Sequence, residues 1–130
     1  MDKPWWIAYG KEASRVFQGE RLTAKCNDRY CDKVHFFYSE NSGAGAIALA
    51  ELFGARKIIL LGYDCKYNQD GKRHWHEDHP KWLGNAGALP RWSKHFEDVA
   101  RRIQHCEVVN ATRDTALTVW PEISLEAALT

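Results

Sequence analysis

The chain has 130 residues, of which 45% are hydrophobic and 27% are charged, and its formal net charge at pH 7 is +1. This length and balance predict a single globular domain over residues 1–130 with a core of its own. A net charge so near zero argues against a protein dedicated to duplex nucleic acid, because neutralising phosphates requires a clustered surplus of Lys and Arg.

The N-terminal part of the chain predicts three strands. Trp5–Tyr9 is aromatic and apolar, which favours a strand, and Lys11–Gln18 is weakly helical. Arg21–Cys26 predicts a short strand, and Asn27–Lys33 is polar and typical of a turn. Val34–Tyr38 combines a β-branched residue with aromatic ones, so we expect a strand there as well.

The middle of the chain carries the clearest local signals. We expect Ser42 to cap a helix over Gly43–Phe53, and Gly54 to adopt the left-handed conformation that ends such a helix. Lys57–Leu61 is almost entirely apolar, as in a parallel strand that is covered on both faces. Cys65–Leu89 shows no periodicity, and a loop of this length in a small domain is usually functional.

The C-terminal part predicts a helix, a strand and a short final helix. Pro90 suits the first turn of a helix that runs to about His105, with Trp92 on its apolar face. Glu107–Asn110 predicts a strand followed by a polar turn, and Ser124–Leu129 a helix capped by its first residue. The alternation of strands and helices predicts an α/β fold, a three-layer αβα sandwich with a mostly parallel, Rossmann-like sheet.

Two glycine-bearing turns suggest a binding site for an anion. Ser42, Gly43 and Gly45 open a helix, whose N-terminal N–H groups favour a phosphate, although the lysine of a P-loop is absent. Gly62 and Asp64 follow a buried strand, at the end where open α/β sheets bind ligands. We expect both turns at one edge of the sheet, with Asp64 holding a ribose hydroxyl or a magnesium ion. Capping and tight packing are the structural alternative.

The long loop concentrates side chains that could act as bases or ligands. His74 and His76 share a face in an extended segment, and His76 and His79 share one in a helix, so no regular conformation presents all three. Three interpretations stay open. The histidines could bind zinc, which needs three or four converging ligands, or one of them could act as a base in catalysis. They could also belong to a solvated loop without a chemical role. Trp75 and Trp82 could stack on a base or a sugar. The other candidate ligands in this loop are Cys65, Glu77 and Asp78.

We expect a cytoplasmic protein with reduced cysteines. The longest apolar run, Ile58–Leu61, is too short to cross a membrane, and the N-terminus lacks the apolar segment of a signal peptide. Cys26 and Cys31 have no second adjacent pair with which to hold zinc, so a structural role is expected for them. Nothing in the sequence points to a particular oligomeric state.

The arrangement from Ser42-Gly43 to Asp64 resembles a known family. A serine–glycine turn opens an apolar helix, Gly54-Ala55-Arg56-Lys57 follows, and a strand then ends in Gly62-x-Asp64. This order is similar to that of bacterial sialyltransferases that use CMP-activated sialic acid and of the archaeal 6-hydroxymethylpterin pyrophosphokinase group. The Val109–Thr112 turn resembles the uncharacterised members of the same group.

The resemblance implies a role for each matching residue. Ser42 and Gly43 would contact the nucleotide, with Gly62 and Asp64 beside it. Tyr67 lies one position from the family's phosphate-binding tyrosine, and His79 is the best match to the family's base, with His74 and His76 as rivals. The first strand lacks the family's glycine- and asparagine-bearing turn, because Gly10-Lys11-Glu12 follows it here.

Three functional hypotheses follow. The first is a nucleotide- or sugar-nucleotide-binding protein, similar to glycosyltransferases, whose donor would be a sugar nucleotide and whose use of a divalent metal ion is left open. The second is a non-catalytic binding module of the same fold. The third is a small metal-dependent hydrolase or nuclease that uses His74, His76 and His79.

Overall fold

The computed structural model describes residues 3–25, 27–71, 77–83 and 89–130. It mixes helices with short strands, and both of its two-stranded sheets are parallel. In chain order the elements are α1 (Lys3–Val16), β1 (Leu22–Thr23), β2 (Asp32–Lys33), α2 (Ser42–Leu52), β3 (Lys57–Leu60), the 3₁₀ turn η1 (Lys81–Leu83), α3 (Leu89–Ala100), β4 (Glu107–Asn110) and α4 (Leu125–Ala128).

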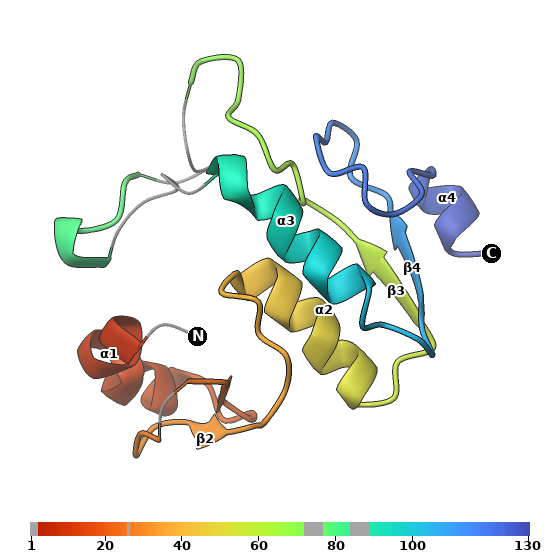
Figure 1. Ribbon diagram of the computed structural model, residues 1–130. Coiled ribbons are helices and arrows are strands. Elements are labelled where there is room, and N and C mark those ends of the chain that lie inside the picture. The colour runs from red at the N-terminus through yellow and green to blue at the C-terminus, as the bar shows by residue number, and fades with distance from the viewer. Residues whose placement is uncertain (1–2, 26, 72–76, 84–88) are drawn as a thin grey trace.

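The main sheet pairs β3 with β4, in a register that runs from Lys57 opposite Glu107 to Leu60 opposite Asn110. Helices α2 and α3 lie side by side over one face of this pair, and α4 lies toward the other (Figure 1). Because side chains alternate along a strand, each strand contributes to two apolar clusters. The α2–α3 side holds Ala44, Ile47, Leu60, Phe96, Val99, Val108 and Leu117, and the α4 side holds Ile59, Val109, Ala111, Ile123 and Ala128.

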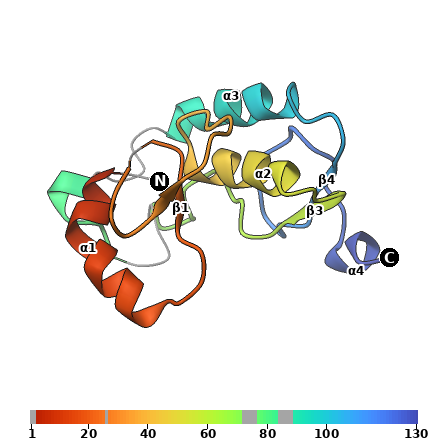
Figure 2. The ribbon, with the colours of Figure 1, turned by 90° about the horizontal axis from the view of Figure 1, so that it is seen from below.

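The N-terminal elements form a separate small cluster beside this core. Figure 2 shows α1 and β1 on one side and α2, α3 and the β3–β4 pair on the other. Leu22 of β1 pairs with Asp32 of β2, and Trp6 packs with Cys31. Gly10 permits close contact, because a Cβ atom there would lie 2.7 Å from the Cδ2 atom of Tyr30.

The predicted strand over Trp5–Tyr9 is wrong, since these residues belong to α1. Aromatic residues favour strands only where a neighbouring strand offers a pleated surface. In a helix, Trp6, Gly10 and Ala13 share one face at intervals of four and three residues, and that face packs against Tyr30. Packing between distant segments therefore overrides the local preference.

The predicted strand over Val34–Tyr38 is also wrong, because none of its residues belongs to a strand. The backbone N–H of Val34 donates to the carbonyl oxygen of Thr23, but no ladder continues from it among the described residues. Phe37 instead packs against the main core, and the guanidinium of Arg102 lies 3.9 Å from the centre of its ring. The aromatic side chain is used for packing outside a sheet.

The α-helices and strands from α2 onward agree with the prediction, apart from their ends, whereas the 3₁₀ turn η1 falls in the segment predicted to be a loop. Gly54 has the expected left-handed conformation, with φ of +86°, and Ser124 caps α4 through a 3.1 Å bond from the N–H of Ala127. The N-cap of α2 is Asn41 rather than Ser42, because the Oδ1 atom of Asn41 accepts from the N–H of Ala44 at 3.0 Å. Asn and Ser are about equally good caps, so local preference could not separate them.

Helix α3 ends at Ala100 and not near His105. The carboxylate of Glu51, on α2, accepts bonds from the N–H groups of Gln104 and His105 at 2.9 and 3.2 Å. These two donors are thereby satisfied outside a helix, by a residue more than fifty positions earlier in the chain. The end of α3 is thus set by tertiary contact.

We expect Glu51→Ala to lower the free energy of unfolding by about 1 kcal/mol, because two backbone donors lose a charged acceptor near the surface. Glu97→Ala is the matched control, since the carboxylate of Glu97 forms an exposed 3.4 Å ion pair with Arg101 and accepts no backbone N–H from another described residue. Its expected cost is under about 0.5 kcal/mol. Urea denaturation followed by circular dichroism measures both, and equal costs would contradict the capping role of Glu51.

Candidate functional site

The turns that follow β3 and β4 lie at the same end of the sheet, because the two strands are parallel. The backbone N–H of Tyr63 donates to the hydroxyl of Thr112 at 3.0 Å, which ties the first turn to the second. The hydroxyl of Tyr63 donates to the carbonyl oxygen of Gly43 at 3.2 Å. The N-terminus of α2 and both strand ends are therefore joined directly.

Asn110 is the centre of this junction. Its side chain is fully buried. Its Nδ2 atom donates to the carbonyl oxygen of Leu117 at 3.2 Å and to the hydroxyl of Thr115 at 3.3 Å. Its Oδ1 atom accepts from the N–H of Thr112 at 3.1 Å. The Thr115 hydroxyl donates in turn to the carbonyl oxygen of Tyr63 at 2.6 Å. A buried and well-satisfied polar network thus fixes the loop after β4.

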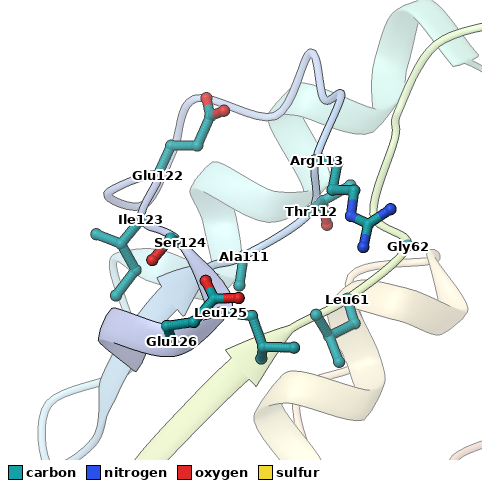
Figure 3. A pocket seen from close by; sticks show the side chains of 10 residues that line it. All are labelled: Leu61, Gly62, Ala111, Thr112, Arg113, Glu122, Ile123, Ser124, Leu125 and Glu126. Atoms are coloured by element: carbon teal, nitrogen blue, oxygen red, sulfur yellow. The ribbon is translucent and has the colours of Figure 1, made fainter. Parts of the chain in front are cut away.

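An open pocket of about 760 Å³ lies at this end of the sheet (Figure 3). Figure 3 shows Arg113 on the side of Gly62, with Glu122 and Glu126 across from it. Arg113 has no ion-pair partner among the described parts of the chain. The remaining lining residues are Leu61, Ala111, Thr112, Ile123, Ser124 and Leu125.

A second pocket of about 340 Å³ adjoins the first and shares Gly62, Thr112 and Arg113 with it. Asp64 and Tyr67 also line it, so three residues selected from the sequence meet here. The remaining lining residues are Lys66, Asn68 and Asp114, and Lys66 forms an ion pair with Asp114.

Gly62 adopts φ of +73°, a left-handed conformation that glycine takes without strain. Apart from Gly62 and its two chain neighbours, no described residue has an atom within 4 Å of the position that a Cβ atom would occupy there. The backbone of Gly62 therefore faces open space between the two pockets, where a ligand could approach it closely.

Ser42, Gly43 and Gly45 lie outside the lining of both pockets. Ser42 is exposed and Gly45 is buried. Asn41 already accepts hydrogen bonds from two N–H groups of this helix end, those of Ala44 and Gly45. At Gly43 a Cβ atom would lie 3.0 Å from the Tyr63 ring, so this glycine permits close packing. Contact of these residues with a ligand stays a prediction.

His79 lines a different pocket, of about 430 Å³, together with residues of α1. Trp5, Tyr9 and Glu12 line the same pocket, whereas Tyr67 does not. Among these pockets, Tyr67 and His79, the two residues proposed for catalysis, therefore line different ones. His74 and His76 lie outside the described residues, as does Trp75. Over the described ranges, no group of three or more His, Cys, Asp or Glu side chains is arranged to hold a metal ion.

Burial sets the protonation of two groups beside the pockets. The pKa of the Cys65 thiol is raised to about 11, mainly by burial and secondly by the neighbouring Asp64 carboxylate. The pKa of the Tyr63 hydroxyl is also raised, again by burial first and by Cys65 second. Both groups are therefore neutral at physiological pH, and Tyr63 keeps the proton that it donates to Gly43.

The raised pKa of Cys65 predicts slow alkylation. Near pH 8 we expect iodoacetamide to label folded Cys65 far more slowly than the same residue in concentrated urea, with a rate that rises toward pH 11. Between the ordinary thiol pKa and about 11 the folded state binds more protons, so this thiol's contribution to stability falls as pH rises. Peptide mapping by mass spectrometry follows the reaction. Equal rates for folded and unfolded protein at pH 8 would contradict the assignment.

Arg113, Thr112 and Asn110 were not selected as site residues from the sequence. The available signal was a polar turn, Ala111–Asp114, directly after a predicted parallel strand. Such a turn lies at the ligand-binding end of an α/β sheet. The convergence of the turn with Gly62 required knowledge of which strands are neighbours.

Comparison with known proteins adds no assignment. No protein-family model matches the chain, and no match was found among curated proteins or solved structures. In the parts of the chain that the structure describes, no helix combines the length and apolar character that crossing a membrane would require.

Proposed function

We propose that the protein binds a nucleotide or a sugar nucleotide at the ends of β3 and β4. The observation that supports this most is that two adjoining pockets share Gly62, Thr112 and Arg113 where two parallel strands end. In this proposal Arg113 contacts a phosphate, for which its planar, permanently charged guanidinium is well suited. The exposed backbone at Gly62 lets the phosphate approach the chain.

Asp64 and Tyr67 complete the proposed site. The carboxylate of Asp64 can accept hydrogen bonds from ribose hydroxyls or hold a magnesium ion. Magnesium would also offset the carboxylates of Asp114, Glu122 and Glu126, which otherwise repel a phosphate. We therefore expect binding to be tighter in the presence of Mg²⁺.

The proposal includes a Rossmann-like, three-layer arrangement around β3 and β4. It is supported by the two apolar clusters on opposite faces of the strand pair, one with α2 and α3 and one with α4. It is also supported by a parallel bridge between Asn110 and Glu122, which extends the pairing beyond β4. A ligand site at the carboxyl ends of strands is the common arrangement in such sheets.

Calorimetric titration with CMP, UDP and the nucleoside cytidine, each with and without Mg²⁺, tests the proposal. We expect CMP to bind at least about ten-fold more tightly than cytidine, and Arg113→Ala to remove this difference, because a charged hydrogen bond contributes about 1.5–3 kcal/mol. Arg91→Ala is the matched control, since Arg91 is exposed on α3 and lines neither pocket. Absence of binding at millimolar nucleotide would refute the proposal.

A non-catalytic binding module is the second candidate function. It is favoured by the position of His79 in a pocket that Tyr67 does not line, because base catalysis needs a histidine within reach of the bound substrate. Chromatographic assay of CMP- and UDP-sugars after long incubation distinguishes the two. Binding without hydrolysis or transfer supports the module, and turnover that His79→Ala abolishes supports the transferase.

A further inference from the structure

One edge of β3 is unpaired within the described part of the chain. The carbonyl oxygens of Arg56 and Leu60 accept bonds from the β4 strand and the residue after it, each at 2.9 Å. Backbone groups alternate in direction along a strand, so Lys57, Ile59 and Leu61 direct theirs to the opposite edge. No hydrogen bond joins the backbone of these three residues to another described residue.

The side chains at this edge leave it accessible. Lys57 is exposed, and Leu61 is 56% exposed although it is apolar. By alternation both lie on the same face of the sheet as Ile59, which packs in the cluster that includes α4. An open strand edge with apolar side chains is a template for another strand.

We propose that a second copy of this chain adds its own β3 to this edge, antiparallel and related by a two-fold axis at Ile59. The axis runs perpendicular to the sheet, so the α4 faces of both copies stay on one side. Lys57 of each copy then lies opposite Leu61 of the other. A parallel, in-register pairing would instead place lysine beside lysine.

Charge complementarity favours this arrangement. Leu61 forms part of the lining of the larger pocket, which also contains the carboxylate of Glu126. Lys57 of the second copy would reach the lip of that pocket beside Leu61, covering its apolar surface with the lysine stem and facing Glu126 with the ammonium group. Each copy thereby contributes a cation to the other copy's pocket.

Whether this added cation helps to hold a phosphate rests on the proposed function, whereas the pairing of the two strands does not. A few residues from each strand bury less surface than stable dimers do, so we expect dissociation in the micromolar range or weaker. The dimer should therefore be visible at high protein concentration without any nucleotide.

Sedimentation velocity over a wide range of protein concentration tests the pairing. We expect the unmodified chain to shift from monomer to dimer, and Leu61→Lys to raise the dissociation constant at least about ten-fold, because it opposes two lysines directly. Combining Leu61→Lys with Lys57→Glu should restore the dimer, since each position then faces an opposite charge. Leu129→Lys is the control, because Leu129 is 70% exposed and lies outside the edge.

Amide hydrogen exchange gives a second measurement. The N–H groups of Ile59 and Leu61 should become protected as protein concentration rises, and this should be lost with Leu61→Lys. A monomer at every concentration, or a dimer that Leu61→Lys leaves intact, would overturn the proposal. Failure of nucleotide titration without a change in sedimentation would refute the proposed function alone.

Discussion

Phe96→Ala is expected to lower the free energy of unfolding by about 3–5 kcal/mol, because it leaves a large cavity at the centre of the core. Phe96 is only 2% exposed, and its ring makes edge contacts with Tyr63 and Trp120 at centroid distances of 5.8 and 6.1 Å. The tip of the ring also reaches α2, since a Cβ atom at Gly43 would lie 3.5 Å from it. One side chain thus joins α3 to the turn after β3, to the loop before α4 and to the start of α2.

Phe53→Ala is the matched control for this prediction. Phe53 is 61% exposed at the end of α2, so its truncation should cost less than about 0.5–1 kcal/mol. Urea denaturation followed by circular dichroism measures both. Phe96→Leu serves as a milder variant if Phe96→Ala does not fold. A cost for Phe96→Ala no larger than that for Phe53→Ala would show that Phe96 does not organise the core.

Asn110→Leu is expected to cost about 2–4 kcal/mol, because it preserves volume but removes the partners of several buried polar groups. The N–H of Thr112, the carbonyl oxygen of Leu117 and the hydroxyl of Thr115 each lose a bond to Asn110. Since the same network holds the loop that carries Arg113, nucleotide affinity should fall together with stability.

Asn41→Ala is the comparison for Asn110→Leu. It removes one capping bond, to the N–H of Ala44, and should cost about 1 kcal/mol. Thermal and urea denaturation give the two stabilities, and calorimetry gives the affinities. If Asn110→Leu costs no more than Asn41→Ala, the network does not hold the loop after β4.

The site residues that could be predicted are those that directly follow a predicted strand in the sequence. Gly62 and Asp64 were selected because they follow a buried strand, and the structure places both with Tyr67 in one pocket. Their role in binding stays a prediction. Arg113 was missed, because its turn can be assigned to the site only when the preceding strand, β4, is known to lie beside β3.

His79 shows that order along the chain does not predict where a loop residue lies. Its selection depended on a resemblance in order along the chain, but the pocket that it lines also contains residues of α1, more than sixty positions earlier. The path of a loop over the surface depends on its contacts with distant segments, and these contacts cannot be predicted from the local sequence.

The sequence by itself determined α2, β3, β4 and the cap of α4, because helical or strand periodicity, a left-handed glycine and a capping serine act within a few residues. The tertiary structure alone decided that Trp5–Tyr9 is helical and that Val34–Tyr38 joins no strand. It also decided where α3 ends, through Glu51, and that Asn110 links the two strand ends. These outcomes depend on which partner each segment finds, and burial and hydrogen bonding to a distant partner outweigh the small local preferences of the chain.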